Sequence, residues 1–229
     1  MNGFETPGPV IRLEKVTKIF NDSGQPTTAV REVSLEARRG EMVLLLGPSG
    51  SGKTTLLTLI AGLTRPTSGS ISLFGKNVEE YSATELQSLR AERIGFVFQT
   101  FLLIDSLTAT ENIEIVLRFN RKRRAGRAGK TRALLGELGI EHLADRFPRA
   151  MSQGEKQRVA IARAIANDAE LLIADEPTGS LETRQAIDII ALLHGQAERR
   201  NTTVIVASHD LRLKEFADRT LRLQDGMIS

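Results

Sequence analysis

The sequence predicts an α/β fold, in which helices cover both faces of a mainly parallel β-sheet. Short apolar runs recur along the 229 residues, and each is bounded by glycine or polar residues. Their apolarity is continuous rather than alternating, which is typical of strands buried on both faces. Stretches with helical periodicity alternate with these runs, and that alternation is the pattern of an α/β fold.

The predicted strands of the main sheet are residues 42–46, 94–98, 171–174 and 203–207. Two early runs, residues 33–37 and 71–74, predict a smaller antiparallel sheet. Helical spacing of apolar residues predicts helices at residues 54–63, 155–166 and within 183–199, where Ile187, Ile190 and Leu193 carry the pattern. Residues 106–149 contain no strand-like run, so a helical insertion is expected there.

The composition excludes several classes of protein. Lys and Arg number 31 against 28 Asp and Glu, and a net charge of +3 is too weak to indicate a nucleic-acid binder. The absence of cysteine excludes disulfides and cysteine-type zinc sites. The apolar run 42–46 is far shorter than the ~20 residues that span a bilayer, and residues 1–10 lack the features of a signal peptide. A role at a membrane is therefore expected to require a partner.

The strongest motif lies between the first main strand and the helix that follows it. It matches the phosphate-binding pattern G-x-x-x-x-G-K-[ST] in full, with Gly47, Pro48, Ser49, Gly50, Ser51, Gly52, Lys53 and Thr54. Its glycines let backbone N–H groups point at phosphate oxygens, and the following helix adds its positive N-terminal end. Lys53 is expected to reach the β- and γ-phosphates, and Thr54 to ligate Mg²⁺. The alternative is a simple glycine-rich turn.

A second motif comes at the end of the strand 171–174, where Asp175 and Glu176 follow apolar residues. The end of a buried strand places such acids at the carboxyl edge of the sheet, beside the P-loop. Asp175 can then hold the metal and its hydration shell, and Glu176 can orient or deprotonate the attacking water. A strand ending in a solvated turn is the alternative, and the complete P-loop argues against it.

A third segment, residues 151–158, separates one class of P-loop protein from another. Ser152 and Glu155 match an S-x-x-E capping box, which alone predicts only a capped helix, although such an end can also bind an anion. With residues 159–166, the segment resembles the signature motif of the ABC ATPase family, usually written LSGGQ. Gln153 stands in place of the first glycine and Glu155 in place of the glutamine, while Ser152 and Gly154 match.

Other residues occupy places that matter in the same family. Gln99 and His209 each follow a predicted strand, where the family's Q-loop glutamine and switch histidine lie. Residues 180–182 match the D-loop, with Glu182 where the family usually has aspartate. Phe20 takes the place of the aromatic residue that stacks on adenine; a packing anchor is the alternative. A lone histidine or glutamine is usually solvated, so it is the order around a full P-loop that points to function.

The resemblance covers roughly residues 10–228 and implies a single domain over residues 1–229. It implies a RecA-like P-loop core, a small antiparallel β subdomain and an inserted α-helical subdomain at about residues 100–155. ATP and Mg²⁺ are the implied cofactors. The implied catalytic residues are Lys53, Gln99, Glu176 and His209, and the implied metal ligands are Thr54, Gln99 and Asp175. The implied nucleotide-binding residues are Phe20, residues 47–54 with Thr55, and Ser152, Gly154 and Glu155.

The resemblance also implies partners. A head-to-tail homodimer would bind ATP between the P-loop of one subunit and residues 152–155 of the other. A membrane permease subunit would hold the chain in the cytoplasm, on the inner face of the cell membrane, and no nucleic acid is expected. Residues 95–103 and 174–182 look most like the branch containing the ATP-binding subunits of lipoprotein-release and macrolide-export systems. The apolar cluster after Gln99, near residues 100–108, predicts the docking groove for the partner, with local packing as the alternative.

Two other functions and one local feature complete the hypotheses. A soluble ABC ATPase acting on nucleic acid or ribosomes usually has two cassettes, a long coiled coil or zinc-binding cysteines, none of which this sequence has. A P-loop kinase would have no reason to carry the signature segment.

The basic stretch from Arg118 to Arg132 contains Arg121, Lys122, Arg123, Arg124, Arg127 and Lys130 without an acid. It is either a solvated charged segment or one attracted to an anionic membrane face.

Overall fold

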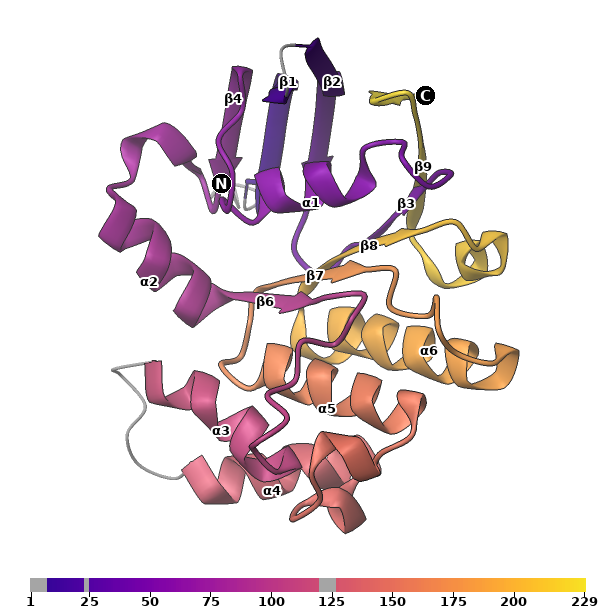
Figure 1. Ribbon diagram of the computed structural model, residues 1–229. Helices are drawn as coiled ribbons and strands as arrows, with labels where there is room; N and C mark the ends of the chain where they lie inside the picture. Colours follow the sequence, from indigo (N-terminus) through magenta and orange to yellow (C-terminus); the bar gives the residue numbers. More distant parts are fainter. Residues whose placement is uncertain (1–7, 23–24, 120–126) are drawn as a thin grey trace, which may run out of the picture.

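The computed structural model describes residues 8–22, 25–119 and 127–229, and two sheets organise them (Figure 1). The larger has the strand order β10-β9-β3-β8-β7-β6. Its strands are β3 (Met42–Leu46), β6 (Ile94–Val97), β7 (Leu171–Asp175), β8 (Thr203–Ser208), β9 (Arg219–Gln224) and β10 (Met227–Ile228). All neighbours pair in parallel except β9 and β10. The α/β prediction is confirmed, and the predicted main strands agree with the observed ones to within a residue.

The main strands are buried on both faces, as their continuous apolarity predicts. Alternate residues of β3 belong to different cores: Met42, Leu44 and Leu46 lie in one, Val43 and Leu45 in the other. The same alternation holds in β7 and β8. The central sheet therefore separates two hydrophobic cores, and its strands β3, β7 and β8 have no solvent-facing side.

The smaller sheet is antiparallel, with the order β2-β1-β4-β5. Its strands are β1 (Ile11–Asp22), β2 (Gln25–Ala37), β4 (Ser68–Leu73) and β5 (Lys76–Asn77). The two runs predicted to form it do not pair directly, because β1 lies between them, with Ile11 opposite both Ala37 and Leu73. The apolar residues of β1 alternate with exposed ones such as Arg12 and Glu14, so it has no continuous apolar run. That alternation is the pattern of a strand with one solvated face.

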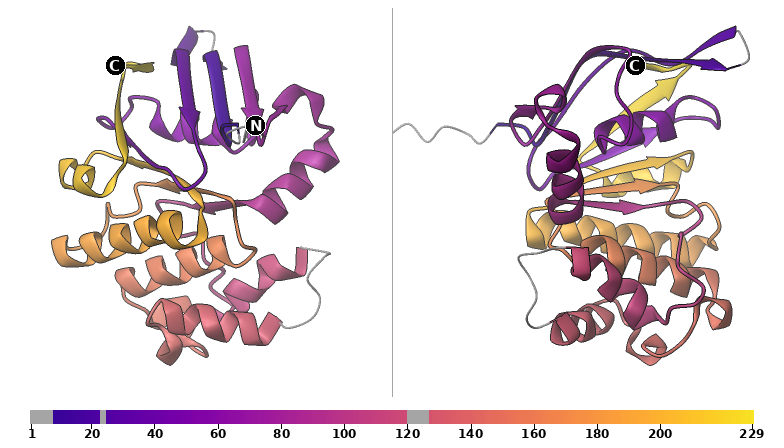
Figure 2. Two further views of the ribbon diagram at one scale, coloured as in Figure 1. Left: turned by 180° about the vertical axis from the view of Figure 1, so that it is seen from behind. Right: turned by 60° about the vertical axis from the view of Figure 1, so that its left-hand side comes forward.

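Six α-helices in the described residues surround the sheets: α1 (Lys53–Ile60), α2 (Ala83–Arg93), α3 (Ala109–Phe119), α4 (Arg127–Glu137), α5 (Gln153–Ile165) and α6 (Thr183–Arg200). Short 3₁₀ turns occupy Val78–Glu80, Glu141–Leu143, Pro148–Ala150 and Leu211–Phe216. Helix α1 packs between the two sheets, whereas α3 to α6 cover the opposite face of the central sheet (Figures 1 and 2). The described part of the helical insertion contains α3 and α4 and no strand, as predicted.

One detail of the sequence prediction is wrong. Ile187 does not belong to the buried face of α6, because 39% of its surface is exposed. Six residues turn a helix by about 600°, so Ile187 and Leu193 are about 120° apart and cannot share one face. The buried stripe instead contains Ala186, Ile189, Ile190, Leu193 and Ala197. Strand β9, which was not predicted, pairs with β3 although it carries polar residues such as Arg219 and Arg222.

The basic stretch from Arg118 to Arg132 is only partly described. Arg121, Lys122, Arg123 and Arg124 lie outside the described residues, and only the backbone of Arg127 is described. Lys130 forms an ion pair with Asp168, at 2.8 Å between Nζ and Oδ1. Among the described helices, none combines the length and apolarity needed to cross a membrane.

Candidate functional site

Three of the predicted catalytic residues and the start of the P-loop lie at one edge of the central sheet, just after the ends of its strands. The register of the parallel strands aligns Val97 with Ala174, Asp175 with Ala207, and Leu46 with Ser208. The residues that follow these strand ends are Gln99, Glu176, His209 and Gly47. Ligands of open parallel sheets bind at this carboxyl edge. The fold thus gathers four separate stretches of sequence at one place.

The P-loop between β3 and α1 is braced by neighbouring strands. Gly52 has φ = 100°, and a Cβ on it would lie 2.2 Å from the carbonyl oxygen of Ala29 in β2. A Cβ on Gly47 would lie 2.2 Å from the carbonyl oxygen of Leu223 in β9. Only glycine fits at either position, since real side chains do not approach a carbonyl so closely. The two sheets therefore fix the loop against which a phosphate can rest.

Lys53, the first residue of α1, points back into this loop. Its Nζ donates to the carbonyl oxygens of Gly47 and Pro48 at 2.8 and 2.9 Å, and lies 3.3 Å from Oε1 of Glu176. Only 6% of Lys53 is exposed. The ammonium is thus held where the P-loop motif places the β- and γ-phosphates.

A metal position is indicated next to Lys53. Thr54 Oγ1 donates to Oδ2 of Asp175 at 2.7 Å, while Oδ1 of Asp175 is buried without a hydrogen-bond partner. Burial raises the pKa of Asp175, Thr54 opposes this, and the nearby charge of Glu176 adds to it. Mg²⁺ prefers carboxylate and hydroxyl oxygens together with substrate phosphates. An unpartnered carboxylate oxygen beside a hydroxyl fits that ion.

Glu176 is held by three side chains. Its Oε2 lies 2.9 Å from Nδ1 of His209 and accepts a hydrogen bond from Ser208 Oγ at 3.3 Å, and its Oε1 faces Lys53. The backbone of Glu176 is left-handed, with φ = 45°, which is uncommon outside glycine and clusters at functional sites. Ser208 was not singled out in the sequence, although its position directly before His209 at a strand end could have indicated it.

The segment at the start of α5 forms the predicted capping box. Ser152 Oγ accepts from the Glu155 backbone N–H at 3.3 Å, and Glu155 Oε2 accepts from the Ser152 N–H at 2.7 Å. The backbone hydrogen bond lowers the pKa of Glu155, so that carboxylate stays ionised. Helix α5 packs on the opposite face of the sheet from α1. One chain therefore does not bring this segment against its own P-loop.

Comparisons with known proteins agree with these motifs. Residues 30–179 match the family model described as ABC transporter. The chain belongs to the ABC transporter family. It is an ATPase of the ABC type, with ATP and Mg²⁺ as cofactors, and the central α/β core is a P-loop NTPase fold.

Individual relatives match this chain over nearly its whole length, but the chain spans different shares of them. It is 38% identical over 96% of its length to the macrolide export ATP-binding/permease protein MacB of Haemophilus ducreyi, but spans only 32% of that protein. It is 37% identical to the putative hemin import ATP-binding protein HrtA of Staphylococcus haemolyticus, over 95% of this chain and 98% of that one. A dimeric structure of the ATP-binding cassette MJ0796 bound to ADP and Pi superposes with a TM-score of 0.89, at 36% identity and 96% coverage of both chains. These matches agree with the macrolide-export branch of ABC ATPases.

Phe20 lies at the surface of this ABC ATPase. The residue is 37% exposed, and Lys18 Nζ lies 5.1 Å from the ring centroid. Phe20 is paired with Thr27 of β2, two residues before Ala29, whose carbonyl approaches the P-loop. Phe20 is therefore partly exposed on a strand whose neighbour contacts the P-loop.

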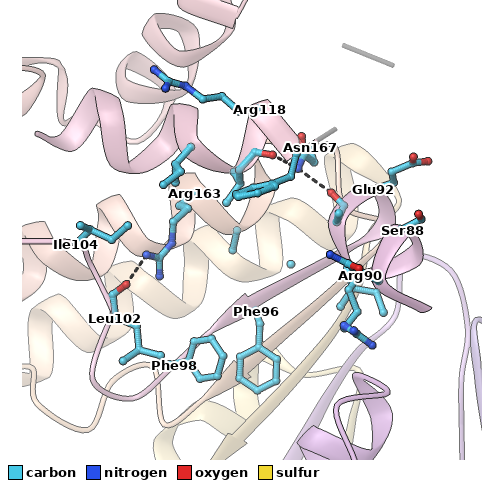
Figure 3. Close-up of a pocket in the computed structure, with 18 of the residues that line it drawn as sticks. Ser88, Arg90, Glu92, Phe96, Phe98, Leu102, Ile104, Arg118, Arg163 and Asn167 are labelled. Atoms are coloured by element: carbon cyan, nitrogen blue, oxygen red, sulfur yellow. Dashed lines mark hydrogen bonds between the residues drawn. The ribbon is translucent and has the colours of Figure 1, made fainter. Parts of the chain in front are cut away.

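A groove of about 850 Å³ lies where the Q-loop of this ABC ATPase passes α2, α3 and α5 (Figure 3). The apolar residues after Gln99, which were predicted to form one cluster, do not all face this groove. Leu102 and Ile104 are 53% and 40% exposed and line the groove, whereas Leu103 packs against the core. The buried amide of Asn112 holds the same loop by bonding the backbone of Ile104, Leu107 and Thr108.

Proposed function

We propose that this chain binds two ATP molecules between head-to-tail subunits and uses hydrolysis to drive a membrane-embedded partner. The observation that carries the proposal is the separation of the P-loop from the capping box at Ser152, on opposite sides of one sheet. The two motifs can serve one nucleotide only if they come from two chains. The dimeric form of the related cassette supports this arrangement.

The proposed mechanism assigns a role to each residue at the sheet edge. Residues 47–55 cradle the phosphates, with Lys53 on the terminal one. Thr54, Asp175 and Gln99 would hold Mg²⁺, which supplies positive charge to the phosphate oxygens. Glu176 takes a proton from the water that attacks the terminal phosphorus, and the bond to ADP breaks. His209 and Ser208 keep the Glu176 carboxylate in place for that proton transfer.

The opposite subunit would complete the site. Ser152, Gly154 and Glu155 are proposed to meet the γ-phosphate from across the dimer, and Phe20 to stack on the adenine. At Gly154 a Cβ would lie 3.3 Å from the Gln185 side chain, so a larger residue there would require that side chain to shift. Gln153 is exposed beside it and leaves the Ser152 cap intact. The backbone N–H groups of Gln153 and Gly154 thus remain available to a phosphate, whereas that of Glu155 donates to Ser152 Oγ.

A membrane permease is the proposed partner. MacB of Haemophilus ducreyi carries ATP-binding and permease functions in its name, and this chain spans 32% of that protein. A permease subunit would supply what the described helices lack and would keep the chain on the inner face of the cell membrane. We assign the whole chain, residues 1–229, to a single cassette in which about residues 100–155 form the helical subdomain. Neither alternative, a nucleic-acid ATPase or a kinase, has a feature in its favour.

The groove beside the Q-loop is the proposed docking place for that partner. Its lining combines exposed Leu102 and Ile104 with Phe96 and Phe98, an apolar surface of the kind that marks an interface. Leu103 is excluded from this surface, since it packs inward. A segment of the permease seated here would touch the loop that carries Gln99.

Substitution of Leu102 tests the docking place. We expect Leu102→Asp to reduce co-purification of the membrane subunit while ATP binding by the isolated cassette stays at the wild-type level. Met227→Asp is the matched control, because Met227 is 47% exposed and lies in β10, at the opposite end of the larger sheet from β6, which lines the groove. Full co-purification with Leu102→Asp, or an equal loss with Met227→Asp, would contradict the proposed groove.

A further inference from the structure

The loop that follows Gln99 has an unusual backbone. Phe101 and Leu102 are consecutive, neither is glycine, and both are left-handed, with φ of 60° and 48°. Such conformations cost free energy in residues with a Cβ and persist only when contacts hold them. Within the backbone, the Phe101 N–H donates to Phe98 at 3.0 Å and the Leu102 N–H to Thr100 at 2.7 Å. These short local bonds make a tight turn, and the two carbonyl groups of the turn need partners.

Arg163 supplies the partners for both carbonyl groups. Its NH1 donates to the carbonyl oxygen of Leu102 at 2.5 Å (Figure 3), and its NH2 donates to that of Phe101 at 2.6 Å. The guanidinium is planar with a fixed fork of donors, which suits two neighbouring acceptors. Burial lowers the pKa of Arg163, which reflects the loss of water around this group in the groove. The pair of bonds therefore clamps the turn to the side chain.

The clamp connects the two parts of the proposed ATP site. Arg163 lies near the end of α5, and the same helix begins at the Ser152 capping box. The helix is anchored in the core by Val159, Ile161, Ala162 and Ile165. A rigid helix thus runs from the segment that meets the opposite subunit's nucleotide to the loop behind Gln99.

We propose that Arg163 is a positioning residue, which holds the Phe101–Leu102 turn and so places Gln99 for Mg²⁺ in the bound ATP complex. This inference rests on the proposed role of Gln99 as a metal ligand. Arg163 itself does not touch the nucleotide. Its effect should therefore appear in the magnesium-dependent part of ATP binding, whereas a purely structural arginine would change stability alone.

Calorimetric titration of the full chain with ATP, in excess Mg²⁺ and in excess EDTA, measures that part. Arg163→Met should weaken binding roughly tenfold in Mg²⁺, at the lower end of the loss typical for a residue that orients a metal ligand. Binding in EDTA should stay unchanged. Arg163→Lys keeps the charge but has no planar fork, so an intermediate loss is expected. Gln99→Ala should show the same loss, and the double variant Gln99→Ala, Arg163→Met should be no weaker than Gln99→Ala alone.

Arg158→Met is the matched control. Arg158 lies on the same helix and also donates to a backbone carbonyl, that of Leu138 at 3.2 Å, away from the Q-loop. Wild-type magnesium dependence in Arg163→Met, additivity with Gln99→Ala, or an equal effect of Arg158→Met would each overturn the inference. If Arg163→Met does not fold, unchanged magnesium dependence in Arg163→Lys overturns it as well. Lys53→Ala, measured alongside, separates the two proposals: wild-type binding there refutes the nucleotide site itself, whereas weak binding there with normal Arg163 variants refutes only the role of Arg163.

Discussion

The sheet edge and the start of α5 differ in how complete they are within one chain. At the edge, Lys53, Asp175 and Glu176 are almost entirely buried and contact one another or their neighbours at hydrogen-bond distance. At the start of α5, Ser152 and Gln153 are exposed, and the capping box has one further side-chain contact among those described, 3.3 Å between Glu155 Oε1 and Nε2 of His142. The comparison teaches that one half of the proposed catalytic site is assembled within a single chain, while the other half needs the second chain of the proposed dimer.

The largest effect is expected from removing the positive charge of Lys53 at the sheet edge. Lys53→Ala should abolish ATP hydrolysis, because no other described cation is placed at the P-loop carbonyls that Lys53 contacts. Steady-state phosphate release, with the partner present, is the measurement. Near-normal turnover would show that the buried cluster at the sheet edge is not the reaction site.

The next effect separates binding from chemistry within the same half. Glu176→Gln should bind ATP but hydrolyse it about 10²–10⁴-fold more slowly, since an amide cannot accept the proton of the attacking water. With ATP and Mg²⁺ the variant should elute as a dimer in size-exclusion chromatography. Normal hydrolysis would reject Glu176 as the base. A monomer would count against the dimer if the partner also failed to drive dimerisation.

A smaller effect tests whether the presented half serves another chain. Subunits with Lys53→Ala and subunits with Ser152→Arg should each be inactive alone. Random mixing makes about half of the dimers mixed, each with one intact site, so about a quarter of the sites should return. Phosphate release by the mixture is the readout. If mixed dimers form and no activity returns, both motifs act within one chain, and the contrast drawn above is wrong.

The smallest effect concerns the free energy of unfolding, which the buried carboxylate of Asp175 at the sheet edge lowers at neutral pH. Burial raises the folded-state pKa of Asp175 above its unfolded value, so the favourable contribution of the protonated group is complete below the unfolded pKa and is lost as pH rises through the folded pKa. At neutral pH the buried carboxylate is therefore destabilising without a metal. Asp175→Asn should raise the melting temperature of the nucleotide-free protein by roughly 2–4 °C, equivalent to about 1 kcal/mol. The gain should vanish at low pH, and a lower melting temperature at neutral pH would contradict this account.

The sequence predicted the parallel sheet because β3, β7 and β8 have no polar face, and these strands could be located to within a residue. It predicted the P-loop, since each position of that motif has one chemical requirement. Strands β1 and β9 were missed because exposed charged residues interrupt their apolar pattern. The roles of Ser208 and Arg163 could not be predicted, since they depend on contacts between segments far apart in the sequence. The Leu102 and Leu103 pair shows the same limit, because adjacent leucines gave no sign of which one faces outward.

The alternation of β3 between two cores has a mechanical consequence. Neighbouring residues of β3 pack into the two hydrophobic cores on opposite faces of the sheet. The two cores therefore cannot slide past each other along this strand. Close-packed interiors deform little, so a rotation of helices α3 to α6 relative to the sheet would have to occur at the loops and not within the cores. The turn after Gln99 is joined to α5 through the two carbonyl groups that Arg163 holds, so it would move with that helix rather than bend independently.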